Sequence, residues 1–251
     1  MGSINISLVA FAIIFGGALL GLLLRAVLPS HHLSPESKDV VKLGMGLVGT
    51  VAALVLGLLI ASAKGSYDSQ SNELNEMASK IVLLDRVLSH YGPETKEIRD
   101  SLHAVAVYNL ENLWSNDASS RVPMEGPAVG NEVIYEKIQT LTPANPEQTS
   151  LQNQALGLIM SLAQTRWLMY AQRAASISTT LLVVLVFWLA IIFISFGLFS
   201  PRNITVVASL FFSALALSCA VLLILEMSAP YSGLIQISKG PLRAAISHLG
   251  K

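Results

Sequence analysis

Charged residues are scarce in this chain. They make up 13% of its 251 residues, whereas a typical soluble domain carries roughly 25%. Apolar residues make up 53%, and the formal net charge is zero. The sequence has no block of like charge that would match the phosphate backbone of a nucleic acid. The shortage of charge indicates contact with lipid, and we expect no nucleic-acid partner.

Cysteine and catalytic motifs are scarce as well. The one cysteine, Cys219, lies in an apolar run and has no second cysteine in the chain with which to form a disulfide. The sequence has no phosphate-binding loop, nucleophile elbow, HExxH or CxxC pattern. Its five histidines have no second ligand at a useful helical spacing. We therefore expect no enzyme, no metal site and no cofactor.

Four uncharged runs are each long enough to cross a bilayer as a helix. They cover residues 2–24, 43–63, 174–201 and 203–225. A hydrocarbon core of about 30 Å needs roughly 20 helical residues. The first run lacks the basic start of a cleaved signal peptide, and its apolar core is too long for one. The sequence therefore predicts an all-α integral membrane protein with four transmembrane helices.

A polar stretch separates the second run from the third. Residues 64–173 carry nine Lys or Arg and thirteen Asp or Glu, a net charge of about −4. Apolar residues recur there at steps of three and four, which is typical of helices with one buried face; in the first predicted helix they are Met77, Ile81, Leu84 and Leu88. We expect helices up to residue 91, over 93–115, near 131–141 and from 146 onward, with a loop over 116–130.

The chain divides on this pattern into four segments. They are the first two transmembrane helices (1–63), a helical insert (64–173), the last two transmembrane helices (174–227) and a tail (228–251). Few helix-breaking residues follow the second span or precede the third, so both helices are expected to continue beyond the membrane.

Ser200-Pro201 is expected to start the fourth span, because serine can cap a helix and proline suits its first turn. The segment 230–243 fits either a short interfacial piece or packing against the insert.

Lys and Arg near the span ends predict the orientation. The side that holds the termini and the insert has more of them, and such a bias marks the cytoplasmic side. We therefore expect a multi-pass protein with its termini and its insert in the cytoplasm.

Small residues at steps of four form one face of the second span. Such a face lets another helix approach closely in lipid. The other helix is expected either in the same chain or in a neighbouring subunit, and the sequence favours neither strongly. The residues of this small-residue face are Gly49, Ala53, Gly57, Ala61 and Gly65.

The opposite side of the same span carries larger apolar residues. Around the axis of an oligomer they would form a ring, and an apolar ring can gate a pore by excluding water. The alternative is that they face lipid or the third span. These candidates for a pore constriction are Val51, Val55 and Leu59, with Ser62 one turn on.

Charged residues at the span ends are a second group of candidates. They are costly in a membrane and often functional there, although long side chains also reach the interface without any special role. Glu226 ends an apolar span, and its expected partner is Lys64 or Arg173, whereas Asp85-Arg86 in the insert is expected to be a solvated or bundle-capping pair. The candidates are Arg25, Asp39, Lys42, Lys64, Arg173 and Glu226.

Three segments resemble a known family. PESKDVVKLGMGLVGTVAALVLGLLIASAKGSYD at 35–68 is similar to the signature DESxDVVxLGxGLxxTxAALVLGLLxASAK of a bacterial membrane family described as bestrophin-like. LLDRVLSHYGPETKEIRDSL at 83–102 and LILEMSAPYSGLIQISKGPLR at 223–243 resemble it too. The chain departs from the pattern at Pro35, where an acidic residue is expected, and at Ser228-Ala229-Pro230, where an acidic residue is usual before the proline.

The resemblance implies a function. Bestrophins are pentameric chloride-type channels with four spans per subunit, cytoplasmic termini and a second span that lines the pore. The resemblance therefore implies a homo-oligomeric ion channel in the bacterial inner (plasma) membrane, with a pentamer favoured and with lipid and small inorganic ions as partners. The aromatic neck residues of animal bestrophins are absent here, and no anion site is implied. The alternative is a membrane-anchored interaction or sensor protein whose insert binds a partner.

Overall fold

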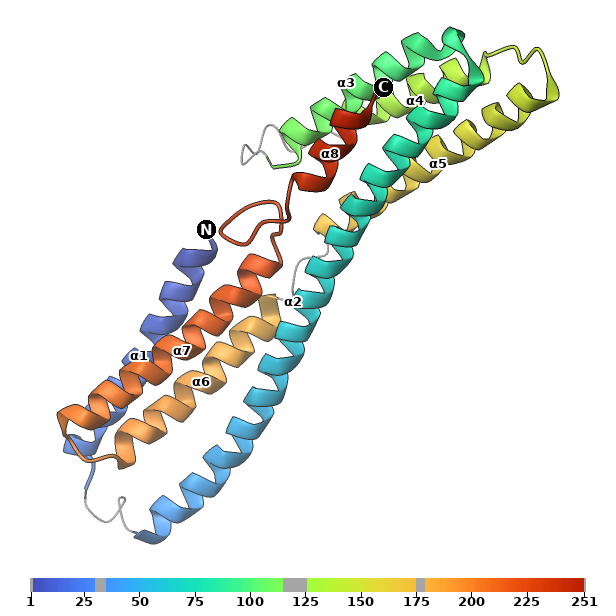
Figure 1. Ribbon diagram of the computed structural model, residues 1–251. Helices are drawn as coiled ribbons and strands as arrows, with labels where there is room; N and C mark the ends of the chain where they lie inside the picture. The colour runs from blue at the N-terminus through green and yellow to red at the C-terminus, as the bar shows by residue number, and fades with distance from the viewer. Residues whose placement is uncertain (1, 30–34, 115–125, 175–178, 251) are drawn as a thin grey trace. The chain divides into compact units, whose positions relative to one another are not determined.

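The computed structural model describes residues 2–29, 35–114, 126–174 and 179–250, and all regular secondary structure in these ranges is helical (Figure 1). Those ranges contain no strand, which confirms the predicted all-α class. The helices of the described ranges are α1 (Ser3–Val27), α2 (Pro35–Tyr91), α3 (Lys96–Asn112), α4 (Gly126–Gln139), α5 (Pro146–Ala174), α6 (Thr179–Phe199), α7 (Ile204–Met227) and α8 (Gly240–His248), and the 3₁₀ turn η2 (Pro93–Thr95) precedes α3.

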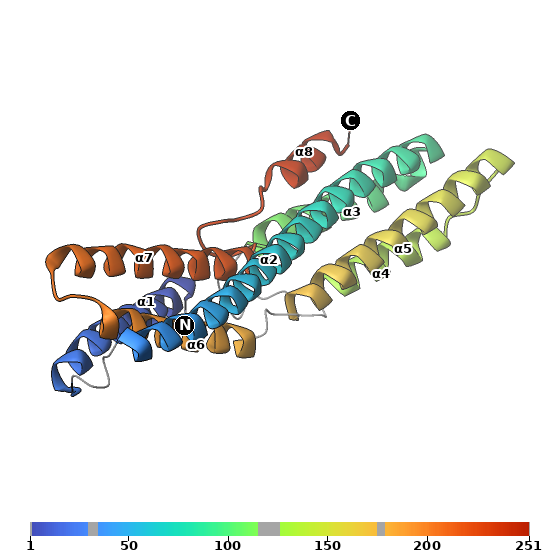
Figure 2. The same ribbon diagram turned by 90° about the horizontal axis from the view of Figure 1, so that it is seen from below.

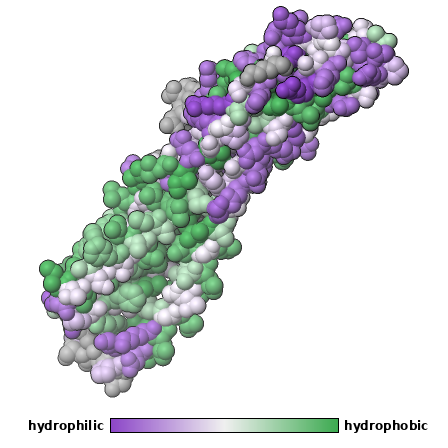
Figure 3. All heavy atoms as spheres, in the orientation of Figure 1, coloured by the Kyte–Doolittle hydropathy of each residue, from purple (hydrophilic) through white to green (hydrophobic). Residues whose placement is uncertain are grey.

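The chain forms two compact units. The first consists of Met1–Gly65 and Ser176–Ser228, and the second of Ser66–Ala175 and Ala229–Lys251. The visible face of the first unit is mostly hydrophobic, and that of the second is mostly hydrophilic (Figure 3). The long helix α2 contributes its beginning to the first unit and its end to the second.

The first unit contains four helices that are long and apolar enough to cross a membrane. They are α1, the beginning of α2, α6 and α7. α1 packs along both α6 and α7, and both views show these three helices side by side (Figures 1 and 2). Their interior is built from side chains such as Ile14, Leu185 and Val221, each of which is fully buried.

Glycine allows α1 and α6 to approach closely. A Cβ added at Gly21 would overlap the carbonyl of Ile194 and lie 2.8 Å from the amide nitrogen of Leu198. A Cβ added at Gly197 would likewise overlap the carbonyl of Ala18. Gly17 and Gly21 have the four-residue spacing that allows this contact, but they were not among the predicted packing residues.

The second unit has its own hydrophobic core. The end of α2 places its predicted apolar face inside that core, which confirms the periodicity read from the sequence: Met77, Ile81, Leu84 and Leu88 are at most 4% exposed. The tail also packs here. Ile237 and Leu242 belong to the same core, and the Trp114 indole N–H donates to the carbonyl of Ile237 at 3.0 Å.

Most helix ends follow the sequence, with two corrections. α2 is continuous through Tyr91, as expected, and stops at Gly92, whose φ of 143° favours glycine. α4, in contrast, begins at Gly126 and not near 131. The predicted cap of the fourth span was also wrong: Asn203 caps α7, its side-chain oxygen accepting from the Val206 amide at 2.8 Å. The predicted continuation of the third span into the helix that precedes it depends on residues 175–178, which lie outside the described ranges.

Candidate functional site

The beginning of α2 exposes a stripe of leucines. Leu43, Leu47, Leu54 and Leu58 are 74%, 72%, 69% and 64% exposed. They recur at steps of four, seven and four residues, so they share one face of the helix. Large exposed apolar patches mark contacts with a membrane or with another protein. The leucine stripe, defined by these four residues, therefore requires lipid or another chain to cover it.

The small-residue face of α2 is open in the single subunit. A Cβ added at Gly49, Gly57 or Gly65 meets no atom within 4 Å. Ala53 and Ala61 are exposed. The sequence allowed two partners for this face, a helix of the same chain or one of a neighbouring subunit. At these glycines, no described helix of the same chain is packed closely against the face.

The four candidates for a pore constriction divide into two pairs. Val51 is 45% exposed and Ser62 is also exposed. Val55 is half-buried and Leu59 is only 4% exposed, because this side of α2 faces the interior of its own subunit. Nearly buried Ala52 and Ala63 lie on the same inward side.

Two arginines tie α1 to the connection between α6 and α7. Arg202 donates from Nε and Nη2 to the carbonyl oxygen of Leu22, at 3.2 and 2.7 Å. Arg25 donates from Nη1 to the carbonyl oxygen of Ser200. Ser200 lies just beyond the end of α6, where a carbonyl has no intrahelical donor, whereas Leu22 lies inside the last two turns of α1. Arg25 was among the predicted charged candidates and Arg202 was not, although a basic residue just before an apolar run is a signal in the sequence.

The remaining charged candidates are less closely coupled. Asp39 and Lys42 form a 3.9 Å ion pair whose side chains are 74% and 62% exposed, so its contribution to stability is small. Glu226 is 3% exposed near the end of α7. Both Glu226 and Lys64 interact with neighbouring groups. Their predicted pairing, or that of Glu226 with Arg173, stays a prediction, since the Arg173 side chain lies outside the described part of the structure.

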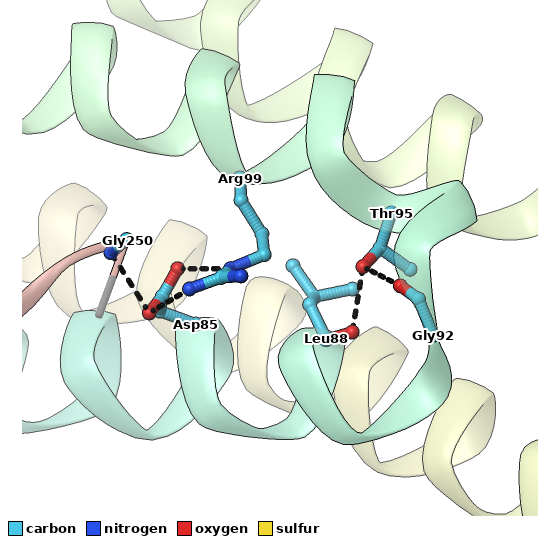
Figure 4. Close-up of polar contacts among 6 residues, drawn as sticks. All are labelled: Asp85, Leu88, Gly92, Thr95, Arg99 and Gly250. Atoms are coloured by element: carbon cyan, nitrogen blue, oxygen red, sulfur yellow. Dashed lines mark hydrogen bonds and ion pairs between the residues drawn. The ribbon is translucent and has the colours of Figure 1, made fainter.

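A buried ion pair lies in the second unit (Figure 4). The guanidinium of Arg99 donates from Nε to Asp85 Oδ1 at 2.7 Å and from Nη2 to Oδ2 at 3.0 Å. The amide of Gly250 donates to the same Oδ2 at 3.3 Å, so the carboxylate also holds the tail. The hydrogen bonds to Asp85 raise the pKa of Arg99, against the opposing effect of burial. The predicted Asp85-Arg86 pair was therefore wrong in its partner and in its exposure, because Asp85 is 1% exposed.

No metal centre is assembled within the described ranges. Three or more His, Cys, Asp or Glu side chains do not come together anywhere in them. The described residues instead provide apolar helices long enough to cross a membrane, two arginine ties and a buried ion pair.

Comparison with known proteins gives a consistent result. A family model for the bestrophin-like domain matches residues 11–242. The structure is similar to two single-substitution variants of a bacterial bestrophin homologue from Klebsiella pneumoniae. The TM-scores are 0.68 and 0.67, at 13% and 12% sequence identity. The alignments cover 94% and 96% of this chain and 97% and 96% of the other chains. At such identity this likeness shows the fold. No curated protein matched the chain.

Proposed function

Since the chain belongs to the bestrophin-like family, whose known members are ion channels, we propose that it forms a homo-oligomeric ion channel in which α2 surrounds a central pore. The observation that carries the proposal is the exposure of α2: only 11% of its apolar stretch is buried, against 39%, 44% and 28% in α1, α6 and α7, and the leucine stripe lies on its exposed side. A ring of helices around an axis would cover such a stripe.

The exposed side of α2 has three parts that suit a ring. Successive residues lie about 100° apart around a helix. Counted in this way, Ala53 and Gly57 lie on one flank of the leucine stripe, and Val51 and Ser62 lie on the other. In a ring, the flanks would contact the two neighbouring copies of α2, and the small residues would allow a close approach.

The leucine stripe would then face the axis. A ring of leucine side chains would make an apolar constriction that water leaves readily, which is one way to gate a pore. The proposal moves the predicted constriction to Leu54 and Leu58, with Val51 and Ser62 on the flank that contacts a neighbouring copy. Leu59 would support the wall from behind, because it is nearly buried in its own subunit.

Subunit number is the first test of this arrangement. The resemblance to bestrophins favours five copies, and native mass spectrometry of the detergent-purified protein would count them. Four or more copies allow α2 to surround an axis. A monomer or a dimer would contradict the proposal, because two helices cannot enclose a pore.

Polar substitutions in the leucine stripe should increase ion leak. Leu54→Ser and Leu58→Ser would let water into the constriction, so we expect ion flux into liposomes to rise several-fold at zero voltage. Leu20→Ser is the matched control, because Leu20 is a 48% exposed leucine on α1 rather than on α2. Equal flux in all three variants would place the leucine stripe away from the pore.

A large side chain on the small-residue face should break the oligomer. Gly57→Leu points into open space within one subunit, so we expect the subunit to fold and the complex to dissociate. Gly16→Leu is the control, since Gly16 on α1 also has no atom within 4 Å of an added Cβ. Native mass spectrometry gives the readout. An intact complex for Gly57→Leu would show that no neighbouring helix lies there.

The proposed orientation places the termini and residues 64–173 in the cytoplasm of a bacterium, with the protein in the inner membrane. The excess of Lys and Arg on that side supports it. Reporter fusions at the C-terminus would be active only if that end is cytoplasmic, and the opposite pattern would reverse the orientation.

A further inference from the structure

The first unit has an open groove where α1 ends and α7 begins. Its volume is about 550 Å³, which lies within the range of ligand clefts, about 300–1,000 Å³. Apolar side chains make up most of its lining, and two polar residues complete it. The lining residues are Leu19, Leu22, Leu23, Arg202, Asn203, Ile204 and Val207.

The apolar walls of the groove are accessible from outside the subunit. Leu23 is 65% exposed and Ile204 is 85% exposed. Both lie on helices that are long and apolar enough to span a membrane. When the first unit lies in a bilayer, lipid reaches a groove on such helices, and the apolar lining suits a hydrocarbon chain.

Positive charge lies at the same place. Arg202 is exposed, and the two hydrogen bonds to the Leu22 carbonyl hold its guanidinium at the groove. None of the ion pairs among the described residues involves Arg202, so its charge is not balanced by a carboxylate there. The Nη1 atom of Arg202 makes no hydrogen bond to a described residue, so its N–H groups can still donate. A guanidinium binds a phosphate by donating two parallel N–H hydrogen bonds to its oxygens.

The start of α7 adds further donors. Asn203 accepts from the amide of Val206 through its side chain and from the amide of Val207 through its carbonyl. The amides of Ile204 and Thr205 precede the first intrahelical hydrogen bond and remain available to an anion. α7 has 24 residues, so its N-terminus also carries the partial positive charge of a helix dipole.

From this combination we propose that the groove binds a phospholipid. The phosphate contacts the Arg202 guanidinium and the first amides of α7, and one acyl chain lies along Leu19, Leu23 and Val207. A free phosphate would use only the Arg202 guanidinium and the amides of α7, and an uncharged lipid would use only the apolar wall. The inference is separate from ion conduction and requires only that the first unit lie in a bilayer.

Lipid binding to the full-length protein tests this proposal. The protein is delipidated in detergent and titrated with phosphatidylglycerol, and native mass spectrometry counts the lipids bound per subunit. We expect one tightly held lipid per subunit in the wild type. Leu23→Trp would fill the groove without removing Arg202, and we expect at least tenfold weaker binding. Leu20→Trp is the matched control, because Leu20 is exposed on the same helix but does not line the groove.

Two further arms separate the contributions of charge and chain. Arg202→Gln should also weaken binding of phosphatidylglycerol, and diacylglycerol with the same acyl chains should bind the wild type at least tenfold more weakly. The proposal is overturned if Leu23→Trp binds phosphatidylglycerol as the wild type does, if diacylglycerol binds equally well, or if the wild type retains no lipid. It is also overturned if a photoreactive residue at position 23 cross-links a second copy of the chain instead of a lipid.

Discussion

Gly21→Ala is expected to separate α1 from α6 and to destabilise the first unit severely. The added methyl group would overlap the carbonyl of Ile194 in α6, which is backbone and cannot rotate away. Overpacking usually costs about 1–3 kcal/mol, and a clash with backbone lies at or above the upper end of that range. We therefore expect a loss of about 3 kcal/mol or more. Thermal unfolding of the detergent-solubilised protein would measure it.

Gly16→Ala provides the control for this prediction. Gly16 lies on the same helix, and an added Cβ there meets nothing within 4 Å. Alanine also favours the helix by up to about 1 kcal/mol relative to glycine. We expect the midpoint temperature of Gly16→Ala to equal or exceed that of the wild type. A Gly21→Ala protein as stable as Gly16→Ala would mean that α1 and α6 are not in close contact.

Gly197→Ala tests the same contact from the other helix. Its methyl group would overlap the carbonyl of Ala18 in α1. Because either substitution already forces the two helices apart, the double variant should lose less stability than the two single losses added together. Full additivity would indicate that the two glycines act at independent places.

Asp85→Ala is expected to produce the largest loss of stability in the second unit. The substitution leaves the Arg99 guanidinium, whose side chain is only 20% exposed, without its carboxylate. Removing one partner of a buried ion pair typically costs about 3–5 kcal/mol, because the remaining charge stays desolvated. The Gly250 amide also loses its acceptor. Hydrogen exchange should therefore become faster in α3 and in the tail that follows Gly240.

Glu97→Ala is the matched control. Glu97 also pairs with a cation on another helix, Lys137 on α4, at 2.6 Å, but its side chain is 82% exposed. We expect little change in hydrogen exchange or thermal stability. If Asp85→Ala exchanges no faster than Glu97→Ala, then the buried ion pair does not hold the tail.

The Glu97 pair also has a defined pH dependence. The hydrogen bond from Lys137 lowers the pKa of Glu97 below its ordinary value. A carboxyl whose pKa is lowered on folding stabilises the protein above its unfolded pKa, and that contribution is lost as the pH falls through the folded pKa. The small difference between Glu97→Ala and the wild type should therefore disappear in acid.

The helices themselves could be predicted from local sequence. Four uncharged runs have the length that a bilayer requires, and each overlaps one of the apolar helices of the structure. The end of α2 could be placed at Tyr91, because Gly92-Pro93 interrupts the helix there. The early start of α4 and the Asn203 cap were missed, since a helix boundary depends on a few hydrogen bonds that the composition around it describes poorly.

The partner of each small or charged residue depended on the tertiary structure. Gly17 and Gly21 show the same four-residue spacing as Gly49, Ala53 and Gly57, yet only the first pair is packed against another helix of the subunit. A spacing pattern permits close approach, but the path of the chain decides which helix arrives. The sequence by itself could therefore name the faces without naming what covers them.

The ion pairs follow the same rule. Asp85 and Arg86 are adjacent in sequence, but neighbouring side chains on a helix point about 100° apart. Asp85 turns inward and meets Arg99, which the turn at Gly92 brings back alongside α2, and the end of the tail completes the site. The sequence alone determined where most helices lie, which of their faces are apolar and which family the chain resembles. Only the tertiary structure decided the contacts between them, because a contact joins residues whose separation along the chain carries no local signal.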